Sequence, residues 1–155
     1  MQQYTWIYTL SEPLTDDAAT ALQEAFDQFT RQWKSHGDLV TGRIELHAHR
    51  FVTVQADPAQ HRPSGCSIDT MRRTVTEILT QRSLTWLDAS WIAWRDKDHH
   101  IRTVHYREIA ALIRAGEMGP DTLVFDHSLG QSDDLSRWEL PLAQTWMARF
   151  LPTPA

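Results

Sequence analysis

A helical stripe followed directly by a strand pattern is the feature that most constrains the fold of this 155-residue chain. Apolar residues recur at spacings of four, three and four, which is the period of one helix face. The stripe consists of Leu22, Phe26, Phe29 and Trp33. Thr15 is the expected N-cap, because its hydroxyl can accept a backbone N–H, and Gly37 is the expected C-terminal stop.

Strand patterns flank this helix on both sides. Residues 6–10 are aromatic and β-branched, and polar and apolar residues alternate over residues 43–56. The second stretch is long for one strand, so we expect two short strands with a tight turn at Ala48-His49. A second helix, capped by Ser67 or Asp69, and a strand at residues 84–87 follow. The resulting β-α-β-β-α-β order predicts a ferredoxin-like unit.

The pattern changes after residue 90. Residues 91–94 and 101–104 predict a hairpin around a polar turn, and residues 106–115 predict a short helix closed by Gly116. Residues 123–125 predict a further strand. We therefore expect an α+β protein with a ferredoxin-like portion at 1–90. A hairpin, helix and strand portion follows at 91–155, and the two are expected to pack as one globular unit.

Composition narrows the classes of function. The net charge is -5 and basic residues are scattered, so the chain offers no basic surface for nucleic acid. One cysteine cannot form an internal disulfide, and the first residues lack the pattern of a secretion signal. No apolar run approaches the roughly 20 residues that a membrane helix needs. A reducing cytoplasm is the expected location.

Several short segments together resemble a small family of uncharacterised bacterial proteins, over nearly the whole chain. They are Trp6-Ile7-Tyr8, Gln32-Trp33 with His36-Gly37, Ser64-Gly65-Cys66-Ser67-Ile68-Asp69, Asp121-Thr122-Leu123-Val124-Phe125, and Trp146 with Arg149-Phe150. Members of that family often carry the label "ABC transporter ATPase". Such an ATPase needs a glycine-rich loop ending in Lys-Ser/Thr, and none of the six glycines lies in that pattern. We therefore expect no ATP site and no cofactor.

A second resemblance is confined to residues 109–138. A helix, the run Ala-Gly-Glu-Met-Gly-Pro-Asp-Thr-Leu-Val and then Trp138 are similar to the second half of GYF-type domains. Those small modules hold proline-rich peptides against aromatic residues. The Gly-Tyr-Phe signature itself is absent from this chain. The resemblance implies a peptide-binding C-terminal portion.

Cys66 is the candidate nucleophile. It is expected where a helix begins, and the unpaired N–H groups there stabilise a thiolate. A histidine base and an orienting carboxylate would complete the chemistry, with His36 as base and Asp69 as the carboxylate nearest in sequence. His47, His49 and His61 are further candidate bases. The alternative is that Cys66 is a small buried packing residue.

Cys66 and Arg72 also have the Cys-x5-Arg spacing of phosphatase and rhodanese loops. That chemistry surrounds an oxyanion with consecutive backbone N–H groups and an arginine fork. Ser64, Gly65 and Arg72 are the candidate binding residues near Cys66. No histidine precedes the cysteine and no glycine lies between Cys66 and Arg72, so a phosphatase is disfavoured.

Eight histidines raise a third possibility, a metal site. His47 and His49 would share a strand face, but a turn at Ala48-His49 would destroy that geometry. A second group is His99, His100 and His105 near the predicted hairpin. Because no recognisable ligand spacing is complete, we expect a solvated turn and no bound metal.

Seven tryptophans favour binding to a partner. Trp91 and Trp94 are three residues apart on a predicted strand, so their side chains face opposite sides. Either one of them is exposed as an anchor for a partner, or both faces of the sheet are covered. Our leading prediction is a protein- or peptide-binding adaptor without catalysis. The alternatives are a Cys66-dependent enzyme and a metal-binding protein.

Overall fold

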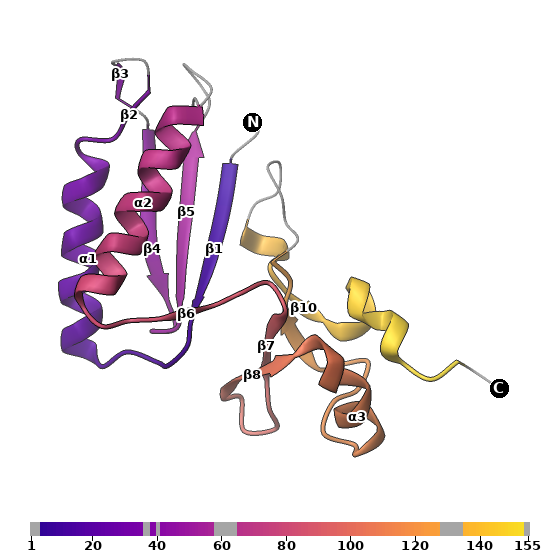
Figure 1. Cartoon of the computed structure of the whole chain (residues 1–155). Coiled ribbons are helices and arrows are strands. Elements are labelled where there is room, and N and C mark those ends of the chain that lie inside the picture. The colour runs from indigo at the N-terminus through magenta and orange to yellow at the C-terminus, as the bar shows by residue number, and fades with distance from the viewer. Residues whose placement is uncertain (1–3, 36–37, 40, 58–64, 128–134, 154–155) are drawn as a thin grey trace. The chain divides into compact units, whose positions relative to one another are not determined.

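A computed structural model describes residues 4–35, 38–39, 41–57, 65–127 and 135–153. Within these ranges it leaves undescribed the side chains of residues 4, 34–35, 38–39, 41, 57, 65–68 and 136. The chain forms two compact units: the first contains the described residues up to Leu87, and the second contains those from Asp88 onward. The protein is α+β, with three α-helices and two four-stranded antiparallel sheets among the described residues (Figure 1). In the same residues, no helix combines the length and apolar character that crossing a bilayer requires.

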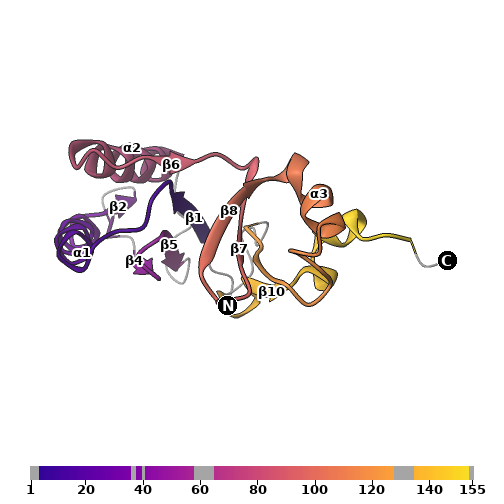
Figure 2. The same cartoon turned by 90° about the horizontal axis from the view of Figure 1, so that it is seen from below.

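The first unit places two helices on one face of a sheet, as Figure 2 shows from below. Its main elements are β1 (Tyr4–Leu10), α1 (Asp16–Thr30), β4 (Thr41–His47), β5 (Phe51–Asp57), α2 (Gly65–Gln81) and β6 (Trp86–Leu87). A two-stranded ladder, β2 (Lys34–Ser35) with β3 (Asp38–Leu39), lies between α1 and β4. The sheet order is β4-β5-β1-β6, and every neighbouring pair is antiparallel.

Alternation along the strands builds the core of this unit. Val52, Val54 and Ala56 of β5 are fully buried on the helical side, where they meet Leu22 and Phe26 of α1. Met71, Val75 and Leu79 of α2 are also fully buried. Their spacing of four residues keeps them on one helix face, as the sequence predicts.

Helix α1 begins as predicted and ends earlier than predicted. The Thr15 hydroxyl accepts the Ala18 N–H at 3.2 Å. The helix stops at Thr30, where the Gln32 N–H turns back to the Phe29 carbonyl, so Trp33 lies beyond the helix. Gly37, the expected stop, lies outside the described residues. Trp33 is nevertheless buried, with its ring stacked on Phe29 at 5.8 Å.

Gly42 of β4 accommodates the Trp33 indole. A Cβ at Gly42 would lie 2.6 Å from the Trp33 ring and 2.9 Å from the Gln55 carbonyl oxygen. The backbone carbonyl cannot move without disturbing the β4–β5 ladder. A glycine is therefore required here for close approach.

The turn predicted between β4 and β5 is confirmed. Ala48 and His49 both have φ of 54°, the left-handed conformation that a tight hairpin turn needs. Arg50, which follows, is buried and donates to the carbonyl oxygens of Leu10 at 2.7 Å and Ser11 at 2.9 Å. Burial lowers the pKa of Arg50, and the Glu12 carboxylate partly opposes this. Arg50 thus joins the hairpin turn to the end of β1.

Helix α2 begins at Gly65, so the expectation that Ser67 or Asp69 caps it is wrong, because both lie inside the helix. Its C-terminal turn uses residues that we expected in a strand. The Leu84 N–H bonds to the Leu79 carbonyl, which limits β6 to Trp86–Leu87.

The second unit contains the predicted hairpin, helix and strand, and short elements that we did not predict. Its elements are β7 (Trp91–Arg95), β8 (Ile101–His105), the 3-10 helix η1 (Tyr106–Glu108), α3 (Ile109–Arg114), β9 (Leu123–Phe125), η2 (Leu135–Arg137), β10 (Glu139–Pro141), η3 (Leu142–Gln144) and η4 (Trp146–Phe150). The sheet order is β10-β9-β7-β8. Its core centres on Ile92, Trp94, Val104, Ile109, Met118, Val124, Leu142 and Met147.

A glutamine from α1 protects the outer edge of β4. The Gln23 amide donates to the Ile44 carbonyl oxygen at 2.6 Å, and its oxygen accepts the Leu46 N–H at 3.1 Å. β4 is an edge strand, and unpaired backbone groups at an edge invite pairing with another chain. The side-chain amide therefore takes the place of a neighbouring strand.

We predict that Gln23→Ala lowers the free energy of unfolding by about 1–2 kcal/mol, because two half-buried backbone groups lose their partners. Gln23→Glu should lower the free energy of unfolding by at least as much at neutral pH, since a carboxylate cannot donate to the Ile44 carbonyl. Urea unfolding measures both. Gln28→Ala, an exposed change on the same helix, is the control. Equal stability of the Gln23→Ala and Gln28→Ala variants would contradict this role.

Candidate functional site

The residues proposed for cysteine chemistry fall mostly outside the described part of the structure. Cys66 lies in the first turn of α2, but its side chain is not among those described. His36, His61 and Ser64 lie outside the described residues, and Gly65 is the first residue of α2. Asp69 and Arg72 are exposed on α2. The Cys66 enzyme therefore stays a prediction.

Trp91 and Trp94 of β7 differ in exposure. Trp91 is 38% exposed, whereas Trp94 is 7% exposed and belongs to the core of the second unit. Trp94 is therefore not the exposed ring of the pair, and its assignment as a binding residue stays a prediction. Its indole N–H is buried without a hydrogen-bond acceptor among the described residues. Trp91 is left as the candidate anchor.

Trp91 belongs to a continuous set of three rings and one guanidinium, which we call the Trp91 platform: Trp91, His105, Tyr106 and Arg107. Trp91 and His105 are directly opposite each other on β7 and β8, with ring centroids 5.7 Å apart and edge to face. The His105 ring stacks on Tyr106 at 4.8 Å. The Arg107 guanidinium lies 5.8 Å from the centre of the Tyr106 ring.

Local hydrogen bonds position His105 and Tyr106 of this platform. The His105 Nδ1 accepts the Arg107 N–H at 3.2 Å, so His105 is the N-cap of η1 and its neutral form has the proton on Nε2. The Tyr106 N–H donates to the Ser90 carbonyl oxygen, and the Tyr106 ring packs against the core. Partner contacts on a fixed surface cost less conformational entropy.

The hairpin turn between β7 and β8 is organised by Asp96. Its Oδ1 accepts the N–H groups of Asp98 at 2.9 Å and His100 at 3.0 Å, and its Oδ2 accepts Arg102 Nε at 2.7 Å. The Arg102 hydrogen bond is the largest cause of a lowered pKa for Asp96. Both oxygens of this carboxylate are thus committed to the turn.

Asp96, Asp98 and His100 are the only group of three metal-ligating side chains found among the described residues, with ligand atoms within 4.8 Å of one another. The Asp96 oxygens already accept hydrogen bonds from within the turn. His105, by contrast, belongs to the Trp91 platform, and His47 Nε2 lies 2.8 Å from the Thr53 hydroxyl. The candidate group of His99, His100 and His105 is therefore not brought within ligand distance of one another among the described residues.

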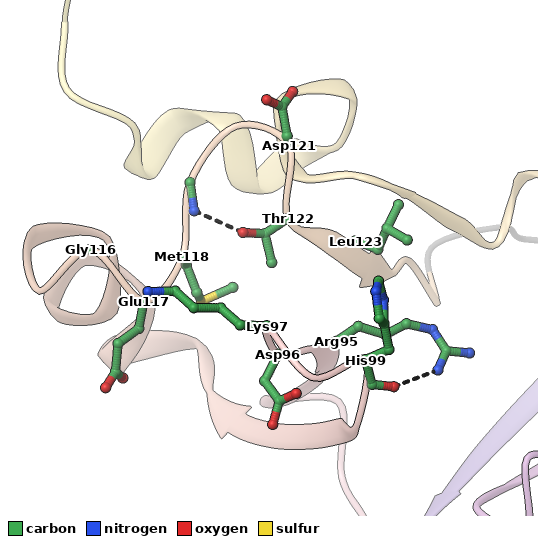
Figure 3. Close-up of a pocket in the computed structure, with 11 residues that line it drawn as sticks. Arg95, Asp96, Lys97, His99, Gly116, Glu117, Met118, Asp121, Thr122 and Leu123 are labelled. Carbon is green, nitrogen blue, oxygen red and sulfur yellow. Dashed lines mark hydrogen bonds between the residues drawn. The ribbon is translucent and has the colours of Figure 1, made fainter.

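A pocket of about 390 Å³ lies between this turn and the loop after α3 (Figure 3). Met118, Thr122 and Leu123 line one side, and the stem of Lys97 crosses it. The Gly119 N–H donates to the Thr122 hydroxyl, and an Arg95 N–H donates to the His99 carbonyl oxygen. A second hollow of about 380 Å³ shares Asp96, Lys97 and Glu117 with it.

Sequence reasoning did not identify this pocket. The sequence signal for it is the turn from Gly116 to Pro120. Gly116 has φ of 77° and follows the end of α3, so the chain folds back toward the hairpin there. The lining offers apolar contact with a charged rim, and it contains no arranged nucleophile and base.

No family model, no curated protein and no solved structure matches this chain. Its function must therefore be inferred from its own residues.

We predict that Arg102→Gln raises the pKa of Asp96 toward its ordinary value of 3.8, since its largest lowering interaction is removed. Because the folded state lowers this pKa, the stabilising effect of the charged Asp96 is present above the ordinary aspartate range and is lost as pH falls through the lowered value. A carbon-13 titration of the Asp96 carboxyl measures the shift. Arg114→Gln is the control, and an unchanged Asp96 titration in Arg102→Gln would refute the assignment.

Proposed function

We propose that this protein is a protein- or peptide-binding adaptor, and that its second unit binds the partner through the Trp91 platform. The observation that supports this most directly is the exposure of Trp91, one of two large apolar side chains that are exposed among the described residues. An exposed tryptophan beside further rings is the usual composition of a binding hot spot.

The ligand class that fits best is a proline-rich segment. Pyrrolidine rings pack flat on aromatic side chains, and a polyproline II segment is already extended, so it loses little entropy on binding. Trp91, His105 and Tyr106 provide successive rings on which such residues could pack. The resemblance of residues 109–138 to GYF-type domains points to the same class.

We propose a finer fold assignment together with this function. The order β4-β5-β1-β6, with α1 and α2 as crossovers, supports a ferredoxin-like first unit. The succession of a hairpin, α3 and two further strands supports a GYF-like second unit. In this proposal the first unit is the scaffold and the second binds the ligand.

The test is titration of the full chain with a fluorescein-labelled decaproline peptide, followed by anisotropy. We predict that Trp91→Ala weakens binding by roughly thirtyfold, the size of a hot-spot truncation of about 2 kcal/mol. Trp146→Ala, which removes the other exposed tryptophan, is the matched control and should bind as the parent does. Circular dichroism confirms that both variants fold.

Two outcomes would refute the proposal. The parent chain could fail to bind decaproline at millimolar concentration, or Trp91→Ala could bind as tightly as the parent.

A further inference from the structure

The other exposed tryptophan belongs to a separate cluster on η4, which we call the Arg149 clamp: Trp146, Arg149 and Phe150. The guanidinium carbon of Arg149 lies 4.9 Å from the centre of the Trp146 ring and 5.2 Å from that of Phe150. The two rings are 6.0 Å apart and steeply inclined, at 69°. One guanidinium is thus held against two aromatic rings.

The segment beneath the clamp is fixed. Met147 is fully buried in the core, and the Thr145 hydroxyl accepts the Met147 N–H at 3.2 Å. The same hydroxyl donates to the Leu142 carbonyl oxygen at 2.8 Å. The backbone of η4 is therefore anchored at Met147, which is next to Trp146 and two residues before Arg149.

Arg149 has no carboxylate partner among the described residues, although other arginines of this unit do. Arg95 bonds to Glu139, and Arg102 bonds to Asp96. Stacking on aromatic rings leaves the edge of a guanidinium, with its N–H groups, free to donate. A fixed guanidinium fork matches the two oxygens of a carboxylate.

We infer that the Arg149 clamp is a second binding site, which takes an aspartate or glutamate side chain of a partner protein segment. The carboxylate would receive two N–H bonds from Arg149, while apolar neighbours in the segment would pack on Trp146. One guanidinium on a chain of net charge -5 suits an isolated carboxylate better than a polyanion such as nucleic acid. The site shares no residue with the Trp91 platform, so its test is independent of the proposed function.

The experiment compares two labelled peptides that differ only in charge. One repeats Gly-Glu-Leu, and the other repeats Gly-Gln-Leu; neither contains proline. We expect the parent chain to bind the glutamate peptide roughly tenfold more tightly in low salt, the value of one charge-assisted contact, and this preference should fade as salt is raised. The Trp146 indole N–H resonance should shift during the titration.

Substitutions then identify the residue responsible. Arg149→Gln should abolish the preference for glutamate, and Arg149→Lys should retain only part of it, because an ammonium has no planar fork. Arg73→Gln removes the same charge from an exposed position in the first unit, and should leave the preference unchanged. Trp146→Phe should restore most of the affinity that Trp146→Ala loses, since a ring suffices to position Arg149.

The proposal is wrong if the parent chain binds both peptides equally. It is also wrong if Arg73→Gln reduces the preference as much as Arg149→Gln, since that would indicate a general charge effect. The peptide comparison uses the unaltered protein, so it remains decisive even if a variant fails to fold. Loss of decaproline binding in Trp91→Ala bears on the Trp91 platform alone.

Discussion

The two-residue repeat of β7 is the constraint on which the functional account depends. A strand must turn successive side chains to opposite faces, so Trp91 and Trp94 cannot share one face. Trp94, Ile92 and Val104 bury together with α3, and this packing fixes the register of the hairpin. Trp91 is thereby directed to the other face, opposite His105. Ala93, on the same face as Trp91, is buried, so Trp91 is exposed at the end of the strand where that cover stops.

Arginine has three different roles in this molecule, and the partner of each guanidinium decides which. Arg50 is buried and bonds to backbone carbonyls, which closes the first unit. Arg102 pairs with a carboxylate and organises the hairpin turn. Arg149 lies against aromatic rings with no carboxylate partner among the described residues. The third arrangement, which Arg107 shares on the Tyr106 ring, leaves a charge-assisted hydrogen bond to be made by another molecule.

Sequence patterns predicted the elements that depend on local physics. The Thr15 cap, the turn at Ala48-His49 and the hairpin after residue 90 follow from capping, backbone conformation and alternation. The end of α1 could not be placed, because the tertiary contacts of Trp33 decide it. The start of α2 was placed too late, since both predicted caps lie inside the helix. β10 is three residues long and ends in Pro141, so it leaves no periodic signal. The alternation of the strand predicts that Trp91 and Trp94 lie on opposite faces. Only the core packing shows which of the two is exposed.

The central claim is that the Trp91 platform is the surface where a partner binds. The most direct measurement is a nitrogen-15 chemical-shift map of the intact chain as a proline-rich peptide is added. The account requires the largest changes at the Trp91 indole and at the amides of His105, Tyr106 and Arg107, while α1 and α2 stay unperturbed. Changes confined to the first unit, or to the pocket around Lys97 and Met118, would contradict it.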